Sequence, residues 1–284
     1  MSADPFQFFV RFIHPERMLP PLPGVTAGLA AQLLQVSAED YAAATAALAK
    51  KREAAVDDML DQAAVASAID SLPETATGTI VGFGDSLTDD FCSWFEMLKL
   101  AFAKRRPAWR VQFVNAGVSG DTTTQMLARM PAVIAAKPDW VICFAGANDL
   151  RRFGTAMNVA QSPVGHIVRN LELLRTSVVA ETGAHWVSVT PAGLDQELAD
   201  NSWFWQSLGA RWSAADIAEL GEAIAKSPGT VIDLRNALGR PIDRLFLEED
   251  GLHPTISGQA VIAAAILKGV APELAAWARA PREK

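Results

Sequence analysis

From residue 78 onward, short apolar segments alternate with longer segments of helical periodicity, and this alternation constrains the fold more than any other feature. The apolar segments are β-branched and apolar on both faces, as expected of strands in a covered parallel sheet. The predicted strands lie at residues 79–84, 111–116, 140–146, 186–190 and 230–235. The predicted helices lie at residues 92–105, 123–136, 164–182, 213–226 and 255–268. The pattern predicts an α/β protein: a three-layer α/β/α sandwich with right-handed crossovers.

Polar motifs follow four of the five predicted strands. In a parallel α/β sheet, ligands bind beyond the carboxyl ends of the strands, so these motifs are expected to meet at one edge. The motifs are "GDSL" at 84–87, "NAGVSGDTT" at 115–123, "GAND" at 146–149 and "DGLHP" at 250–254. Each of them alone is typical of a cap or a turn, but their order at successive strand ends indicates a catalytic site.

The first and last motifs carry the residue types of a serine hydrolase. Asp85 and Ser86 are good helix caps, yet Ser86 is also placed to act as a nucleophile. His253 is its natural base, because the pKa of histidine lies nearest neutrality. Asp250, three residues earlier, can accept a hydrogen bond from Nδ1 and hold the tautomer whose Nε2 faces Ser86. Pro254 keeps His253 out of helical geometry, so we expect the imidazole on a loop.

The middle motifs suit an oxyanion hole, which needs donors aimed at a developing negative charge. The predicted donors are the N–H groups of Ser86 and Gly120 and the side-chain amide of Asn148. Ser119, in the same glycine-containing loop, is a second serine near the site. We interpret it as a hydrogen-bonding residue of the loop rather than a nucleophile.

These four blocks resemble the SGNH (GDSL) hydrolase family. The stretches "VNAGVSGDTTTQMLARMP" and "GANDLRRFG" are most similar to its branch of bacterial arylesterases and thioesterase I/lysophospholipase L1. The resemblance covers about residues 78–270 and implies a flavodoxin-like five-stranded sheet. It also implies ester hydrolysis through an acyl-serine intermediate, with the residue roles given above and no cofactor. We therefore divide the chain into a helical extension at 1–75 and an SGNH hydrolase domain at 76–284.

Rival functions lack their required motifs. A dinucleotide site needs G-x-G-x-x-G, but "GFGDSL" lacks the third glycine and the second strand ends in Asn115 rather than an acid. An α/β-hydrolase needs G-x-S-x-G, which is absent. No cluster of histidines and acids has metal-ligand spacing, so we expect no metal. A non-catalytic small-molecule binding module would not need the whole set of catalytic residue types.

Composition narrows the partners and the cellular setting. The net charge of −7 argues against nucleic-acid binding, and the one basic cluster, at 50–52, is typical of a solvated helix face. Cys92 and Cys143 lie in apolar stretches and are predicted to be buried free thiols. We find no signal peptide and no window of ~18 residues that is apolar enough to span a bilayer. The expectation is a soluble, cytoplasmic protein without stable membrane insertion.

The substrate is left open between two classes. The first is a small or short-acyl ester, including aryl esters and acyl-thioesters; the alternative is a carbohydrate O-deacetylase with the same triad. Aromatic residues at 201–212 either wall an apolar pocket or pack in the core. Arg151 and Arg152 either meet an anionic substrate or lie in solvent. The aromatic residues in question are Trp203, Phe204, Trp205 and Trp212.

The extension at 1–75 contains two features that need burial. The stretch at 6–12 carries four phenylalanines, too many for a free tail. A helix from about 38 to 69, capped by Ser37 with Asp40 three residues on, has an apolar stripe. The extension could pack against the back of the α/β domain, pair with a second subunit as a homodimer, or cover the site as a lid. We favour packing on the same chain. The phenylalanines are Phe6, Phe8, Phe9 and Phe12.

Overall fold

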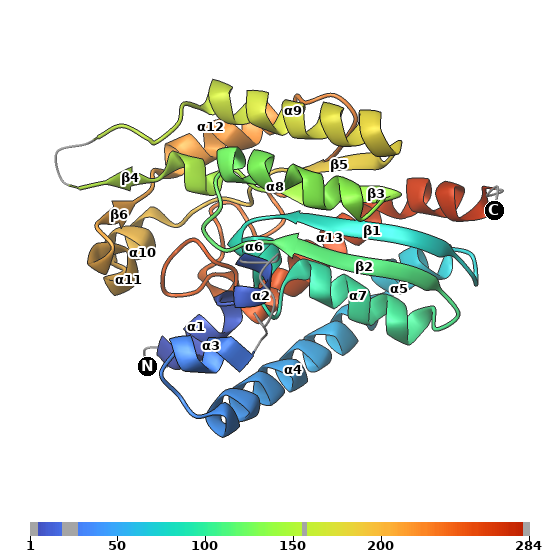
Figure 1. The fold of residues 1–284 in the computed structure, drawn as a ribbon, viewed down its shortest axis with the longest axis horizontal. Coiled ribbons are helices and arrows are strands. Elements are labelled where there is room, and N and C mark those ends of the chain that lie inside the picture. The colour runs from blue at the N-terminus through green and yellow to red at the C-terminus, as the bar shows by residue number, and fades with distance from the viewer. Residues whose placement is uncertain (1–4, 19–27, 155–157, 281–284) are drawn as a thin grey trace.

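A parallel five-stranded sheet forms the centre of the molecule (Figure 1). The computed structural model describes residues 5–18, 28–154 and 158–280. The sheet has the order β2-β1-β3-β5-β7, so in chain order the strands are arranged 2-1-3-4-5, the flavodoxin-like order. This arrangement confirms the predicted fold class. The strands are β1 (Thr77–Gly84), β2 (Arg110–Gly117), β3 (Trp140–Phe144), β5 (His185–Val189) and β7 (Thr230–Ile232).

Helices cover both faces of the sheet, because successive strand residues point to opposite sides and both sets are apolar. Val81 and Phe83 pack beneath α8 (Thr123–Ala135) and α9 (Val164–Thr182). Ile80 instead belongs to the core formed with α7 (Trp94–Arg105) and α13 (Ile256–Arg279). The helix α12 (Ala214–Ile224) lies beside α9 (Figure 1). All five predicted helices are present.

The last helix is longer than predicted. It continues eleven residues past 268 to Arg279, through Pro272, because Leu274 and Trp277 are buried beyond that point. By length and composition alone, α13 is apolar enough to cross a membrane, which corrects the expectation that no such window exists. Its apolar residues are accounted for by the core, since 56% of the window is buried against the rest of the chain.

The N-terminal region forms short helices followed by a long pair. Ser37 caps α4 as predicted, accepting a hydrogen bond from the N–H of Asp40 at 3.0 Å. The single helix expected over about 38–69 is wrong, because the chain turns at Asp61 and Gln62. That turn lets both halves bury apolar residues in the core shared with α7 and α13. The helices are α1 (Pro5–Phe12), α2 (Pro15–Met18), α3 (Gly28–Leu33), α4 (Ala38–Leu60) and α5 (Ala63–Asp70).

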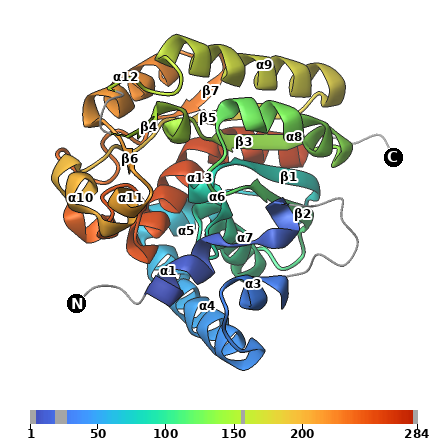
Figure 2. The same ribbon diagram turned by 60° about the vertical axis from the view of Figure 1, so that its left-hand side comes forward.

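Several short elements that sequence periodicity did not predict gather beyond the carboxyl ends of the strands. Each is too short to show a helical or strand period. Helix α1 reaches this end as well and lies near α11 and α6 (Figure 2). The short elements are α6 (Ser86–Asp89), η1 (Ala147–Leu150), β4 (Arg152–Phe153), α10 (Gln196–Asn201), α11 (Trp203–Ser207), β6 (Ala210–Arg211) and η2 (Arg244–Phe246).

Candidate active site

The turn between β1 and α6 both caps the helix and displays its serine. The Asp85 carboxylate accepts a hydrogen bond from the N–H of Leu87 at 3.1 Å, which makes Asp85 the N-cap of α6. Ser86 is the first residue of that helix. Gly84 permits the turn, since a Cβ there would lie 2.3 Å from the carbonyl oxygen of Phe144. One turn therefore both caps α6 through Asp85 and places Ser86 at the start of the helix.

The structure brings Ser86, His253 and Asp250 together. The Oγ of Ser86 lies 2.9 Å from Nε2 of His253, and Nδ1 of His253 lies 2.6 Å from Oδ2 of Asp250. The other carboxylate oxygen of Asp250 accepts hydrogen bonds from the N–H groups of Leu252 and His253, both at 2.9 Å. As predicted, His253 lies on the loop before α13. The two backbone bonds fix the carboxylate, which in turn fixes the imidazole.

Charges around the triad shift its pKa values in opposite directions. Burial alone would lower the pKa of His253, but the adjacent carboxylate of Asp250 raises it above its ordinary value. Burial would raise the pKa of Asp250, but His253 and the two backbone N–H groups lower it overall. Burial raises the pKa of nearby Asp85 to about 7. The Asp250 carboxylate therefore stabilises the imidazolium that forms when His253 takes up a proton.

The predicted oxyanion residues Gly120 and Asn148 line the same pocket as Ser86 and His253. As the first residue of α6, Ser86 has no intrahelical acceptor for its N–H. Gly120 adopts a φ of +86°, which an L side chain rarely takes. The Asn148 amide donates one hydrogen bond to the carbonyl of Asp121 at 3.1 Å, and its second N–H is available to a ligand.

The pocket has a volume of about 280 Å³ and two chemically different sides. Its polar side consists of the triad serine and histidine, the predicted oxyanion residues, Ser119 and Arg151. Its apolar side comes from two distant stretches of chain, one near the N-terminus and one in and after α11. The apolar lining residues are Phe8, Phe9, Phe12, Ile13, Met18, Phe204, Trp205 and Leu208.

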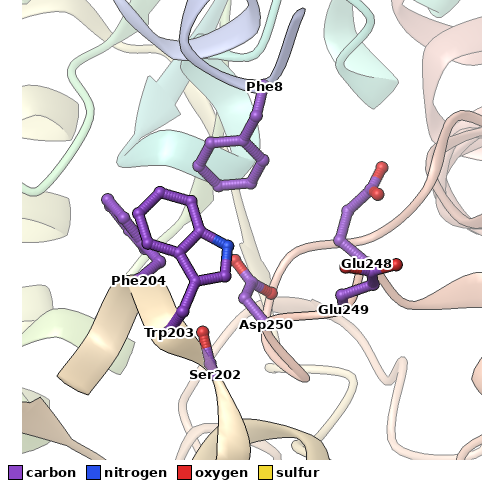
Figure 3. A pocket seen from close by; sticks show the side chains of 7 residues that line it. All are labelled: Phe8, Ser202, Trp203, Phe204, Glu248, Glu249 and Asp250. Carbon is purple, nitrogen blue, oxygen red and sulfur yellow. The ribbon is translucent and has the colours of Figure 1, made fainter. Parts of the chain in front are cut away.

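A second, smaller cavity shares Phe8 and Phe204 with the large pocket (Figure 3). Its volume is about 40 Å³, and it is lined by Phe8, residues 202–204 and the acidic run 248–250. Figure 3 shows the Phe8 ring above the indole of Trp203, with the three carboxylates to one side. Ser86 does not line this cavity, and the cavity is too small for an ester substrate. It is therefore not the substrate site.

The aromatic stretch at 201–212 serves both purposes that the sequence left open. Phe204 and Trp205 line the large pocket. Trp212 is buried and donates from Nε1 to the carbonyl oxygen of Ala147 at 2.8 Å, which makes it a core residue. Trp203 is 52% exposed; it lines the small cavity but not the large pocket.

The two arginines after Asn148 differ as well. Arg152 pairs with Asp216 at 2.6 Å. Arg151 lines the pocket, where its Nη2 donates to the carbonyl oxygen of Gly120 at 3.0 Å. Ser119 donates from Oγ to Asp89 at 2.7 Å, which confirms that it is a hydrogen-bonding residue of the loop. Cys92 and Cys143 are free and buried, as predicted.

The sequence analysis left open a lid over the site but assigned no N-terminal residue to the pocket. Phe8 and Phe12 are four residues apart, so they share one face of α1, and both rings contact the imidazole of His253. The unexplained phenylalanines at 6–12 were the available signal. Residues 5–18 thus contribute to the site, whereas α4 and α5 pack against the α/β domain.

Comparison with known proteins identifies the family of this chain. A model described as the GDSL-like Lipase/Acylhydrolase family matches residues 83–261. The chain belongs to this family. A search among curated proteins gave no match. Residues 5–18 and the helices α4 and α5 lie outside the family match.

Solved structures share the fold. The lipase/acylhydrolase from Enterococcus faecalis is 27% identical, with a TM-score of 0.53, and the match covers 73% of this chain and all of that one. TesA is 21% identical, with a TM-score of 0.51 and coverage of 68% and 99%. The acetyl xylan esterase AlAXEase is 18% identical, with a TM-score of 0.53 and coverage of 68% and 99%. At these identities, the last two show the fold alone.

Proposed function

We propose that this GDSL-family hydrolase is a serine esterase that cleaves carboxylic esters through an acyl-enzyme on Ser86. The observation that carries the proposal is the hydrogen-bonded chain from Ser86 Oγ to His253 at 2.9 Å and from His253 to Asp250 at 2.6 Å. Such a chain activates a hydroxyl that is otherwise a weak nucleophile. It opens onto a pocket large enough for a small ester.

In the first half-reaction, Ser86 Oγ attacks the ester carbonyl carbon while its proton passes to His253 Nε2. The resulting oxyanion is stabilised by the N–H groups of Ser86 and Gly120 and the Asn148 amide. The imidazolium formed is stabilised by the Asp250 carboxylate. Collapse of the intermediate breaks the bond to the alcohol oxygen, which leaves with the proton from His253. The acyl group remains on Ser86.

In the second half-reaction, His253 removes a proton from a water molecule, whose oxygen attacks the acyl carbon. The same three donors stabilise the second oxyanion. Collapse returns the proton to Ser86 and releases the carboxylic acid. No step of this sequence needs a metal, and no group of three or more His, Cys, Asp or Glu side chains in the described part of the chain is arranged to hold one.

The pocket supports small esters over acetylated carbohydrates as substrates. A sugar presents several hydroxyl groups, each of which needs a hydrogen-bonding partner when it leaves water. Beyond the residues proposed for chemistry, the pocket offers Ser119 and Arg151, and both already bond to the protein. Its remaining lining is apolar and fits an ester or acyl-thioester with a hydrophobic part.

The test is labelling with a serine-directed phosphonate, combined with hydrolysis of p-nitrophenyl acetate. Wild type should be labelled at Ser86, and Ser86→Ala should lose both labelling and hydrolysis while its unfolding temperature stays within a few degrees of wild type. Ser119→Ala is the matched control, because Ser119 lines the same pocket, and it should still be labelled at Ser86. Labelling at Ser119, or full activity in Ser86→Ala, would overturn the proposal.

A further inference from the structure

The apolar side of the pocket includes a segment that lies outside the family match. We propose that residues 5–18, here called the N-terminal wall, form the binding surface for the alcohol part of the ester and select esters of apolar or aromatic alcohols. This inference rests on the proposed esterase function. It makes Phe8, Phe9 and Phe12 specificity-determining residues.

The position of the wall relative to His253 assigns it to the alcohol. In ester hydrolysis the histidine gives its proton to the leaving oxygen, so the alcohol must lie within reach of the imidazole. The ring centroid of Phe12 lies 4.6 Å from that of His253, and the centroid of Phe8 lies 5.9 Å from it. In a bound ester, the group attached to the leaving oxygen therefore lies beside these two phenylalanines.

On the apolar side of the pocket, the N-terminal wall contacts an aromatic ring of α11. Phe204 of α11 lies 5.3 Å from Phe8 and 5.9 Å from Phe9, measured between ring centroids. Phe8 and Phe9 are only partly buried, so the protein leaves part of each ring uncovered beside the pocket. Partly exposed rings at a pocket gain free energy when an apolar group covers them.

Arg11 fixes the wall to both loops of the triad. Its buried guanidinium pairs with Asp90, which directly follows α6, and with Glu248, two residues before Asp250. It also donates to the carbonyl oxygen of Pro254 at 3.0 Å. The wall is thus bound to the residues that flank Ser86 and His253.

A second anchor holds the end of the wall to Asp89. Nδ1 of His14 lies 2.9 Å from this carboxylate, and Nη1 of Arg17 lies 2.7 Å from it. Asp89 also accepts hydrogen bonds from the N–H and Oγ of Ser119 in the Gly120 loop. The wall is therefore set in place before substrate arrives, as a specificity surface requires.

The experiment measures kcat/KM for linear alkyl acetates from ethyl to hexyl acetate. These alcohols differ little in acidity, so differences in kcat/KM report contacts with the chain rather than leaving-group chemistry. In wild type we expect kcat/KM to rise by up to about fourfold for each added methylene that the wall covers. Phe9 and Phe204 contact each other. Phe9→Ala and Phe204→Ala should each lower the ratio of kcat/KM for hexyl acetate to that for ethyl acetate by about tenfold.

Leu33→Ala is the matched control. It also removes an apolar side chain from the N-terminal region, but Leu33 is 58% exposed and does not line the pocket, so the ratio should be unchanged. Phosphonate labelling of Ser86 in each variant reports the triad independently of specificity. A ratio near one in wild type, with labelling and hydrolysis intact, would overturn the wall's role while leaving the esterase function standing.

The acyl side is the second arm, measured with ethyl esters from acetate to hexanoate. We expect Phe9→Ala to change this series less than the alkyl acetate series. If Phe9→Ala flattens only the acyl series, the assignment of the wall to the alcohol is wrong. Absence of both hydrolysis and labelling in wild type would instead reject the esterase function itself.

Discussion

The polar and apolar sides of the pocket are built in different ways. The polar side uses loops at the ends of β1, β2 and β3 and the loop before α13, and each side chain is held by bonds within the family-matched region. Much of the apolar side comes from residues 5–18, which pack onto those loops from outside the match. The proposed chemistry thus lies within the family-matched region, whereas the proposed selectivity depends on residues both inside and outside it.

The largest expected effect breaks the polar side alone. Asp250→Asn should keep the two backbone hydrogen bonds but favour the wrong histidine tautomer, lowering kcat by up to ~10⁴. The loss should be similar for ethyl and hexyl acetate, because the wall is untouched. Steady-state kinetics on both esters provides the check.

Glu249→Gln is the control for this change, since Glu249 is the exposed neighbour of Asp250 and loses the same charge. It should retain wild-type kcat. Near-wild-type kcat in Asp250→Asn would remove Asp250 from the mechanism.

The next largest effect is expected when the Arg11 ion pairs, which connect the two sides of the pocket, are removed. Arg11→Met keeps much of the apolar stem but leaves Asp90 and part of Glu248 buried without their cation. Removing one partner of a buried pair typically costs ~3–5 kcal/mol, so we expect a loss of this order in the free energy of unfolding. Urea denaturation measures it.

Arg105→Met breaks a comparable pair with Asp70 at the surface, where both side chains are at least 36% exposed. Such pairs contribute about 0–1 kcal/mol. Equal losses in the two variants would mean that the N-terminal wall is not held by Arg11.

The smallest effect concerns pH and tests the role of His253 on the polar side of the pocket. Only the neutral imidazole of His253 can accept the Ser86 proton, and Asp250 raises its pKa above the ordinary value despite burial. As pH falls through this raised pKa, kcat/KM should drop about tenfold per pH unit, with an acid limb above the ordinary histidine pKa of ~6.5. A pH–rate profile measures the limb.

Asp85, whose pKa burial raises to about 7, is the competing titrating group. Asparagine is also a good N-cap, so Asp85→Asn should preserve α6 and leave the limb in place. Loss of the limb in that variant would assign it to Asp85 instead.

Local patterns predicted the sheet and the Asp250–His253 pair because both depend on short stretches of chain. Ser86 lies 167 positions before His253, and only the rule that the carboxyl ends of parallel strands meet at one edge joined the two. The strands are apolar on both faces, and Asp250 and His253 are three residues apart, so spacing alone indicated their hydrogen bond. The wall depends on contacts that no local pattern encodes. Arg11 meets Asp90 across 79 positions and Glu248 across 237. The phenylalanines signalled burial, but not against which surface.

The bond from Arg11 to the carbonyl of Pro254 has a consequence for synthesis of the chain, since its two partners are 243 positions apart. The N-terminal wall is therefore made well before the loop that receives it. At ~5–20 residues per second, the delay is roughly 10–50 s. During that interval Phe8 and Phe12 lack His253, one of the rings that they contact in the folded protein. The pocket can therefore be completed only after the segment around Pro254 has been made.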